Sequence, residues 1–215
     1  MHIVSVQVGA PRTVGTAQAA NSMERAFTSA IWKSPVEGPV WVGELGLCGD
    51  AVANTRVHGG PEQAVLMYAD AHYPLWRTEW KRPELAAGDF GENLTVSGMT
   101  EDTVCLGDVL EVGRALLQVS RPREPCATLA RRHQVSGLVA VVRANGRSGW
   151  YLRVLREGEV ERGDTIALTE RPHPDWTVRR AGQVMHDRRD REAEAVELAA
   201  LTALSPGWRK RLATG

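Results

Sequence analysis

The alternation of hydrophobic and polar residues predicts a chain built mainly of short strands. Val4, Val6 and Val8 alternate with polar neighbours, which is the two-residue period of a strand. Residues 40–42 form another short β-type run after the turn signals at Pro35 and Pro39. Further strands are predicted at residues 93–96, 103–106, 109–112, 116–119, 150–155 and 165–169. We therefore expect a mostly β body.

Helical patterns are confined to a few segments between these strands and to the C-terminal region. Residues 62–66, 70–80 and part of 128–143 are predicted as helices, the second of them rich in aromatic residues. After Pro174 the composition changes, and residues 184–204 are rich in the helix formers Ala, Glu, Leu and Arg. Ser205 and Pro206 then signal the start of a last short helix. The pattern predicts an α+β chain with peripheral helices, divided into a mostly β domain over residues 1–172 and a small helical domain over 173–215.

The composition narrows the classes of function. The 215 residues include 26 basic and 26 acidic side chains, and this balance favours neither nucleic acid nor an anionic membrane as a partner. Apolar runs such as residues 138–142 are far shorter than the ~20 residues that cross a bilayer. The N-terminal segment lacks the features of a secretory signal. The three cysteines, Cys48, Cys105 and Cys126, are widely spaced, which argues against disulfides, zinc and iron–sulfur sites. We expect a cytoplasmic protein.

Several common cofactor and catalytic motifs are absent from the sequence. There is no G-x-G-x-x-G after a strand and no G-x-x-x-x-G-K-[ST], so the usual signatures for binding dinucleotides and ATP are missing. There is also no H-E-x-x-H and no G-x-S-x-G, the signatures of a zinc protease and of a serine nucleophile elbow. Pyridoxal phosphate is not expected either.

The stretch from Val119 to Cys126 is the strongest candidate for chemistry. Arg121 and Arg123 precede the cysteine, and positive charge near a thiol favours the thiolate. Prolines at 122 and 125 restrict the backbone on both sides. Thiolate is also a preferred ligand of soft metal centres. The alternative is a buried structural cysteine beside a solvated basic loop, and the local pattern alone does not decide between the two.

Three other segments contain polar groups that suit a site, although each has a simpler explanation. His58 begins a glycine turn, which lets a backbone approach a ligand closely but is also a common tight turn. Glu92 and Asn93 stand side by side before a strand, where they can position a substrate or only bond the backbone. Lys33 is flanked by hydroxyl residues and suits a phosphate, or is an exposed lysine without a role.

The order of these motifs resembles the MOSC domain family, and within it the bacterial YiiM-like proteins. The resemblance is carried by the segments 29–36, 45–50, 56–61, 90–94, 107–108, 120–126 and 146–151. It covers roughly residues 1–170 through specific motifs and the helical tail more loosely. The sequence departs from the pattern at Cys48, where an acidic residue is the usual expectation.

The resemblance implies a fold, a cofactor and a set of site residues. The fold is a distorted β-barrel followed by a short C-terminal three-helix domain. The cofactor is the molybdenum–pyranopterin cofactor, with Cys126 as the molybdenum ligand and with His58, Glu92 and Asn93 as further catalytic residues. The resemblance also implies a set of cofactor-binding residues, some near the pterin phosphate: Ser29, Lys33, Arg56, Ser120, Arg121 and Arg123.

The resemblance further implies an activity and partners. Similar proteins, and the related mitochondrial amidoxime-reducing component, reduce N-hydroxylated compounds such as hydroxylaminopurines. The chain contains no motif for an electron-transfer centre of its own, so an external flavin or iron–sulfur reductase is expected as electron donor. A homodimer is suggested by resemblance alone. The alternative function is a sulfur or cofactor carrier that holds a persulfide on Cys126 without turnover of its own.

Overall fold

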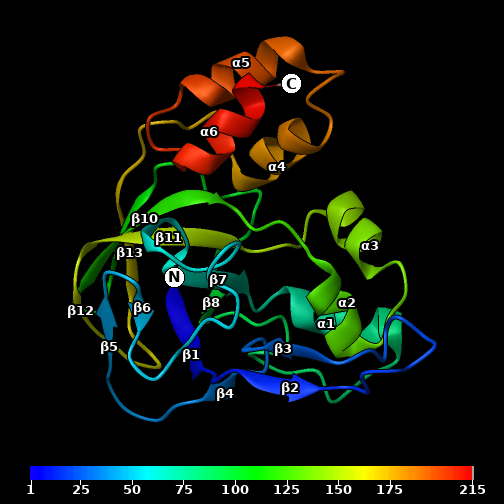
Figure 1. The fold of residues 1–215 in the computed structure, drawn as a ribbon. Coiled ribbons are helices and arrows are strands. Elements are labelled where there is room, and N and C mark those ends of the chain that lie inside the picture. Colours follow the sequence, from blue (N-terminus) through cyan, green and yellow to red (C-terminus); the bar gives the residue numbers. More distant parts are fainter. Residues whose placement is uncertain (215) are drawn as a thin grey trace.

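A large β-sheet forms the body of the molecule in the computed structural model, which describes residues 1–214 (Figure 1). In spatial order its strands are β13 (Ile166–Glu170), β9 (Val109–Val112), β10 (Ala115–Pro122), β11 (Trp150–Arg156), β7 (Val65–Ala69), β8 (Leu94–Ser97), β1 (His2–Val8) and β4 (Ser34–Pro35). Neighbouring strands are antiparallel except β7 and β8, which are parallel.

The end strand β13 meets the start of β1 near the other end of the sheet, which curves the sheet into a distorted barrel. His2 and Thr165 form an antiparallel bridge between the start of β1 and the residues before β13. The Ile166 amide donates to the Met1 carbonyl at 3.0 Å, and the Ile3 amide donates to the Asp164 carbonyl at 2.9 Å. Closure removes free sheet edges, which otherwise invite pairing with other chains. The predicted mostly β body is confirmed.

Smaller sheets and a group of helices complete the body. The additional strands are β12 (Gly158–Val160), β5 (Val40–Gly43) and β6 (Gly46–Leu47) in one sheet, and β2 (Arg12–Val14) with β3 (Phe27–Ser29) in another. The helices are α1 (His72–Trp80), α2 (Ala127–His133), α3 (Leu138–Asn145) and the short 3₁₀ helix η1 (Pro61–Gln63). The aromatic residues Tyr73, Trp76 and Trp80 of α1 lie in a cluster of buried and partly buried side chains with Phe90.

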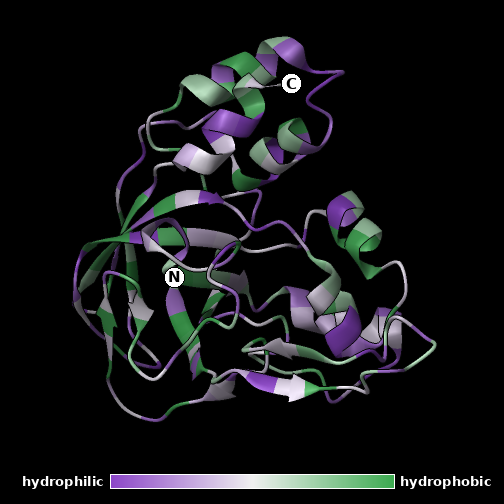
Figure 2. Cartoon of the chain, viewed as in Figure 1, coloured by the Kyte–Doolittle hydropathy of each residue, from purple (hydrophilic) through white to green (hydrophobic). Residues whose placement is uncertain are grey.

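The C-terminal helices lie together beside β10, as Figure 1 shows. They are α4 (Val178–His186), α5 (Glu192–Ala200) and α6 (Pro206–Ala213). Each carries both hydrophobic and hydrophilic residues (Figure 2), and the buried Val184, Leu198 and Trp208 belong to the same hydrophobic cluster as the sheet residue Leu117. Burial of apolar surface therefore fixes this unit onto the body. The predicted C-terminal helices are confirmed.

Two predicted elements are wrong. Residues 62–66, predicted as a helix, form η1 and then enter β7, a strand whose five residues are all buried. A short continuous apolar run fits a buried strand as well as a helix, so periodicity could not separate them. Residues 103–106, predicted as a strand, form turns, and only Cys105 makes an isolated bridge, to Thr177. The chain turns at residues 106–107 and enters β9 at Val109.

Candidate functional site

A cavity of about 410 Å³ lies where the loop before Pro61, the end of β10 and the segment before β8 meet. Pockets of roughly 300–1,000 Å³ hold small ligands and cofactors. The structure brings six of the predicted site residues to its lining: Ser29, Lys33, His58, Asn93, Arg123 and Cys126. Their sequence separation shows that the fold, and not local sequence, assembles the site.

Cys126 is held between an extended loop and a helix. It lies at the N-cap position of α2, and its carbonyl accepts the Leu129 amide at 3.1 Å. The Arg123 amide donates to the Gly149 carbonyl at 3.0 Å, which anchors the loop to the start of β11. Cys126 is partly exposed, whereas Cys48 is exposed without lining the cavity and Cys105 is buried. Cys126 is therefore the cysteine placed for chemistry.

Arg123 lines the same cavity and has an unsatisfied donor. Only 6% of the residue is exposed, and its Nη1 atom has no hydrogen-bond partner among the described residues. Gln63 also lines the cavity, and its buried Oε1 atom has no partner within residues 1–214. A buried polar group without a partner costs free energy, which a bound ligand with matching groups recovers.

Asp50 organises one wall of the cavity, and the sequence analysis did not assign it to the site. Its carboxylate accepts the Gly9 amide at 2.7 Å and the Asn93 side-chain amide at 2.9 Å, and it pairs with Lys33. Asn93 in turn accepts the Leu66 amide at 3.1 Å. Burial lowers the pKa of Lys33, while the Asp50 carboxylate acts in the opposite direction. Lys33 therefore balances an internal charge, and its predicted phosphate contact would compete with Asp50.

His58 begins the expected glycine turn and lines the cavity. Gly59 and Gly60 have φ angles of 76° and 78°, a backbone conformation that favours glycine. Burial, and then the nearby charges of Arg123 and Arg121, lower the pKa of the imidazole below its ordinary value. His58 is thus neutral at neutral pH and offers one N–H donor and one acceptor nitrogen.

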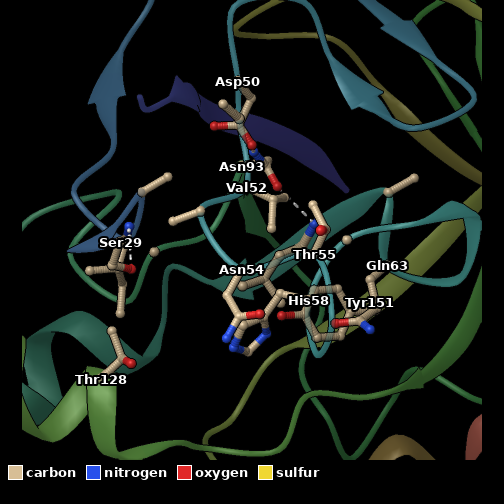
Figure 3. A pocket seen from close by; sticks show the side chains of 18 of the residues that line it. Ser29, Asp50, Val52, Asn54, Thr55, His58, Gln63, Asn93, Thr128 and Tyr151 are labelled. Carbon is tan, nitrogen blue, oxygen red and sulfur yellow. Dashed lines mark hydrogen bonds between the residues drawn. The ribbon is translucent and has the colours of Figure 1, made fainter. Parts of the chain in front are cut away.

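Tyr151 is a second residue that the sequence analysis did not assign to the site. Figure 3 shows Tyr151 and His58 among the side chains that surround the cavity. Its neighbour Trp150 is fully buried in the core, because successive residues of β11 point to opposite faces. Burial raises the pKa of Tyr151, so its hydroxyl stays protonated and can donate. In the sequence, only the alternation of strand residues could have distinguished Tyr151, which lines the cavity, from Trp150, which lies in the core.

Glu92 lies beneath the site and does not line the cavity. It is fully buried, and its carboxylate accepts hydrogen bonds from the Tyr73 hydroxyl, the Gly88 amide, the Phe90 amide and the Thr95 hydroxyl. These donors hold the turn that precedes Asn93. Glu92 is placed to support the loop. This geometry does not favour the catalytic role that was predicted for it, and that role stays a prediction.

Three predicted cofactor-binding residues also lie outside the cavity lining. Ser120 is buried, and its hydroxyl donates to the Glu62 carbonyl at 2.7 Å. The Arg121 guanidinium lies over the rings of Tyr151 and Trp208, at 5.1 and 5.9 Å from their centroids, and so connects the body to α6. Arg56 is exposed in the loop before His58. Their roles in cofactor binding stay predictions.

Comparison with known proteins places the chain in a family. Residues 54–167 match the model of the MOSC domain, and residues 176–214 match the YiiM-like, 3-alpha helix domain. The chain is 36% identical over 209 residues to the uncharacterized protein YflK of Bacillus subtilis, covering 96% of this chain and 90% of the relative. The crystal structure of YiiM from Geobacillus stearothermophilus matches with a TM-score of 0.82 and 37% identity, covering 99% of this chain and 97% of that one.

A fungal protein described as a reductase shares the same body. This Gibberella moniliformis protein is 42% identical over 165 residues, which are 75% of this chain but 29% of the relative. The present chain belongs to the MOSC domain family. Its C-terminal helices are those of the YiiM-like proteins, as the order of motifs predicted.

The residues of the cavity fit the cofactor that this family implies. The molybdenum–pyranopterin cofactor contains a metal that favours thiolate and a phosphate that favours guanidinium. Cys126 supplies the thiol, and Arg123 supplies an unpartnered buried donor on the same loop.

Within the described residues no group of three or more His, Cys, Asp or Glu side chains is arranged to hold a metal ion. In the same part of the chain, every helix is too short or too polar to span a bilayer.

Proposed function

We propose that this protein is a molybdenum cofactor-dependent oxidoreductase that reduces N-hydroxylated bases or related N-oxygenated compounds. The observation that carries the proposal is the joint placement of Cys126 and the unpartnered Arg123 donor on the wall of one cavity. Cys126 would ligate the metal, and Arg123 would bind the phosphate of the pterin. Membership of the MOSC family and the named reductase relative support an oxidoreductase.

The reaction balances with two electrons and two protons. A hydroxylamine R–NHOH accepts both, its N–O bond breaks, and R–NH₂ and water are formed. The bound cofactor supplies the two electrons, which an external flavin or iron–sulfur reductase replaces. Protons must come from groups at the cavity wall or from water.

The chain's own residues orient the substrate and relay protons to it. His58 can take up a proton from solvent at its free ring nitrogen and then release the proton of its other ring nitrogen to the departing oxygen, which leaves a neutral imidazole again. The Tyr151 hydroxyl offers a second hydrogen-bond donor. Asn93 is fixed on both sides of its amide by Asp50 and the Leu66 amide, so it holds a defined position against a polar base.

The test measures conversion of a hydroxylaminopurine to the aminopurine, with a reduced viologen dye as electron source. Protein purified from a cofactor-competent host should turn over the substrate, and protein from a cofactor-deficient host should not. Cys126→Ala should abolish turnover, whereas Cys48→Ala, which removes an exposed thiol outside the cavity, should not change it. A persulfide on Cys126 without turnover in any preparation would instead establish the carrier function and overturn the proposal.

A further inference from the structure

A second and larger cavity lies between the C-terminal helices and the body. Its volume is about 580 Å³, and it is lined by the loop Pro122–Pro125, by α3, and by parts of α4 and α6. Arg123 and Glu124 line both cavities, so the loop that carries Cys126 is the wall between them. Of the residues that line this second cavity, the proposed reaction uses Arg123 alone.

The charge of this second cavity is strongly unbalanced. Its lining contains six arginines and only two carboxylates, Glu124 and Asp187, although the whole chain has a formal net charge of +0. Three arginines are already paired with carboxylates. Arg179 bonds Asp102 at 2.9 Å, Arg211 bonds Glu124 at 3.1 Å, and Arg191 bonds Glu194 at 3.4 Å.

The remaining arginines have unused donors. Arg143 on α3 makes no side-chain hydrogen bond or ion pair within residues 1–214. The Nε of Arg188 is buried and unpartnered in the described structure. Trp208, of which 2% is exposed, lines the same cavity with an equally unpartnered indole N–H. Every one of these orphaned groups is a donor, so the missing partner is rich in acceptors and carries negative charge.

We propose that the second cavity binds the phosphate groups of a nucleotide-sized, phosphorylated small molecule. Phosphate oxygens accept several charge-assisted hydrogen bonds at once, and arginine matches their geometry. The volume lies within the range of roughly 300–1,000 Å³ that holds small ligands. A cavity of limited volume in a chain without net charge suits such a ligand better than the extended basic surface that a nucleic acid requires. The proposal does not depend on the reaction in the first cavity.

Isothermal titration calorimetry at low ionic strength with two probes, inorganic pyrophosphate and ADP, tests this site. Adenosine is the phosphate-free control. We expect both phosphate probes to bind and adenosine not to bind. Arg188→Gln and Arg143→Gln should each raise the dissociation constant about tenfold, because each removes a charge-assisted bond. Arg189→Gln, which changes an exposed neighbour outside the cavity lining, should leave it unchanged.

Two controls keep the outcome interpretable. Arg143 is exposed on α3, so its variant should fold, and circular dichroism verifies this for all three variants. Neither Arg143 nor Arg188 lines the first cavity, so a loss of affinity in these variants reports the second cavity alone. The proposal would be overturned if the wild type did not bind the phosphate probes, or if all variants bound them equally well. A single-stranded oligonucleotide serves as a further probe. Tighter binding of this oligonucleotide than of ADP, weakened as much by Arg189→Gln as by the other two substitutions, would also overturn the proposal.

Discussion

The two cavities share a wall but differ in the balance of charge among their lining residues. In the first, Lys33 is paired with Asp50, and Asp50 is bonded to Asn93, so these charges are balanced, while Arg123 keeps one unpartnered donor for the cofactor. In the second, arginines outnumber carboxylates, and Arg188 and Trp208 keep buried donors without partners. A balanced wall holds side chains in fixed positions, whereas an unbalanced wall attracts an anion. The first cavity therefore holds its polar side chains in fixed positions, and the second attracts a more highly charged anion.

The largest expected effect on stability comes from removing Glu92, which supports the loop beneath the first cavity. Glu92→Leu would leave four hydrogen-bond donors unpaired, among them the Gly88 amide and the Thr95 hydroxyl. We expect a loss of about 4 kcal/mol in the free energy of unfolding, measured by urea denaturation. Glu84→Leu, at a side chain that is 66% exposed, should change it by less than about 0.5 kcal/mol. Equal losses would show that Glu92 does not support the loop.

Acid should weaken the same part of the body. Burial, and then the charge of Arg132, lower the pKa of His133 from 6.5 to about 4. The unfolded chain therefore binds this proton more readily than the folded one, and stability present above pH 6.5 is lost as the pH falls toward 4. The shift corresponds to about 3 kcal/mol.

His133→Gln isolates this contribution, because glutamine does not titrate. The variant should lose less stability than the wild type between pH 6.5 and 4, when urea denaturation is repeated across that range. His133 Nε2 lies 2.8 Å from the Asp89 carbonyl, and glutamine can still donate there. Parallel pH curves for the two proteins would contradict the assignment.

The smallest of these effects compares one aspartate from each cavity. Asp50→Asn leaves Lys33 without its counter-charge, and we expect a loss of about 2 kcal/mol in the free energy of unfolding. Asp187 lines the second cavity, and its side chain is 47% exposed. Its Oδ1 atom lies 3.9 Å from the Nε2 atom of His186. Asp187→Asn should change stability by less than about 0.5 kcal/mol. If the two variants lose the same stability, the contrast between the cavities fails.

Local sequence patterns predicted elements better than they predicted which faces meet. The turn glycines and the helical tail follow from composition, so they were predictable. The start of α4 was missed, although Thr177 caps it by accepting the Arg180 amide at 3.1 Å. A capping threonine in a charged segment is a weak signal beside the hydrophobic pattern used for the tail.

The candidate site shows the same limit. Glu92 and Asn93 are adjacent in sequence, yet one side chain is buried in the support and the other lines the cavity. Neighbouring residues at the start of a strand point to opposite sides, and the sequence alone did not say which side is the site. Lys33 and Asp50 are separated along the chain and meet only through tertiary structure. Long-range pairs of this kind require the fold.

The central claim is that Cys126 binds a molybdenum centre in the first cavity, and metal content tests it most directly. Wild-type protein, Cys126→Ala and the control Cys48→Ala are purified from one cofactor-competent host, and molybdenum per chain is measured by inductively coupled plasma mass spectrometry. The account predicts close to one molybdenum per chain in the wild type and in Cys48→Ala, and almost none in Cys126→Ala. Equal molybdenum in all three proteins, or none in the wild type, would contradict it.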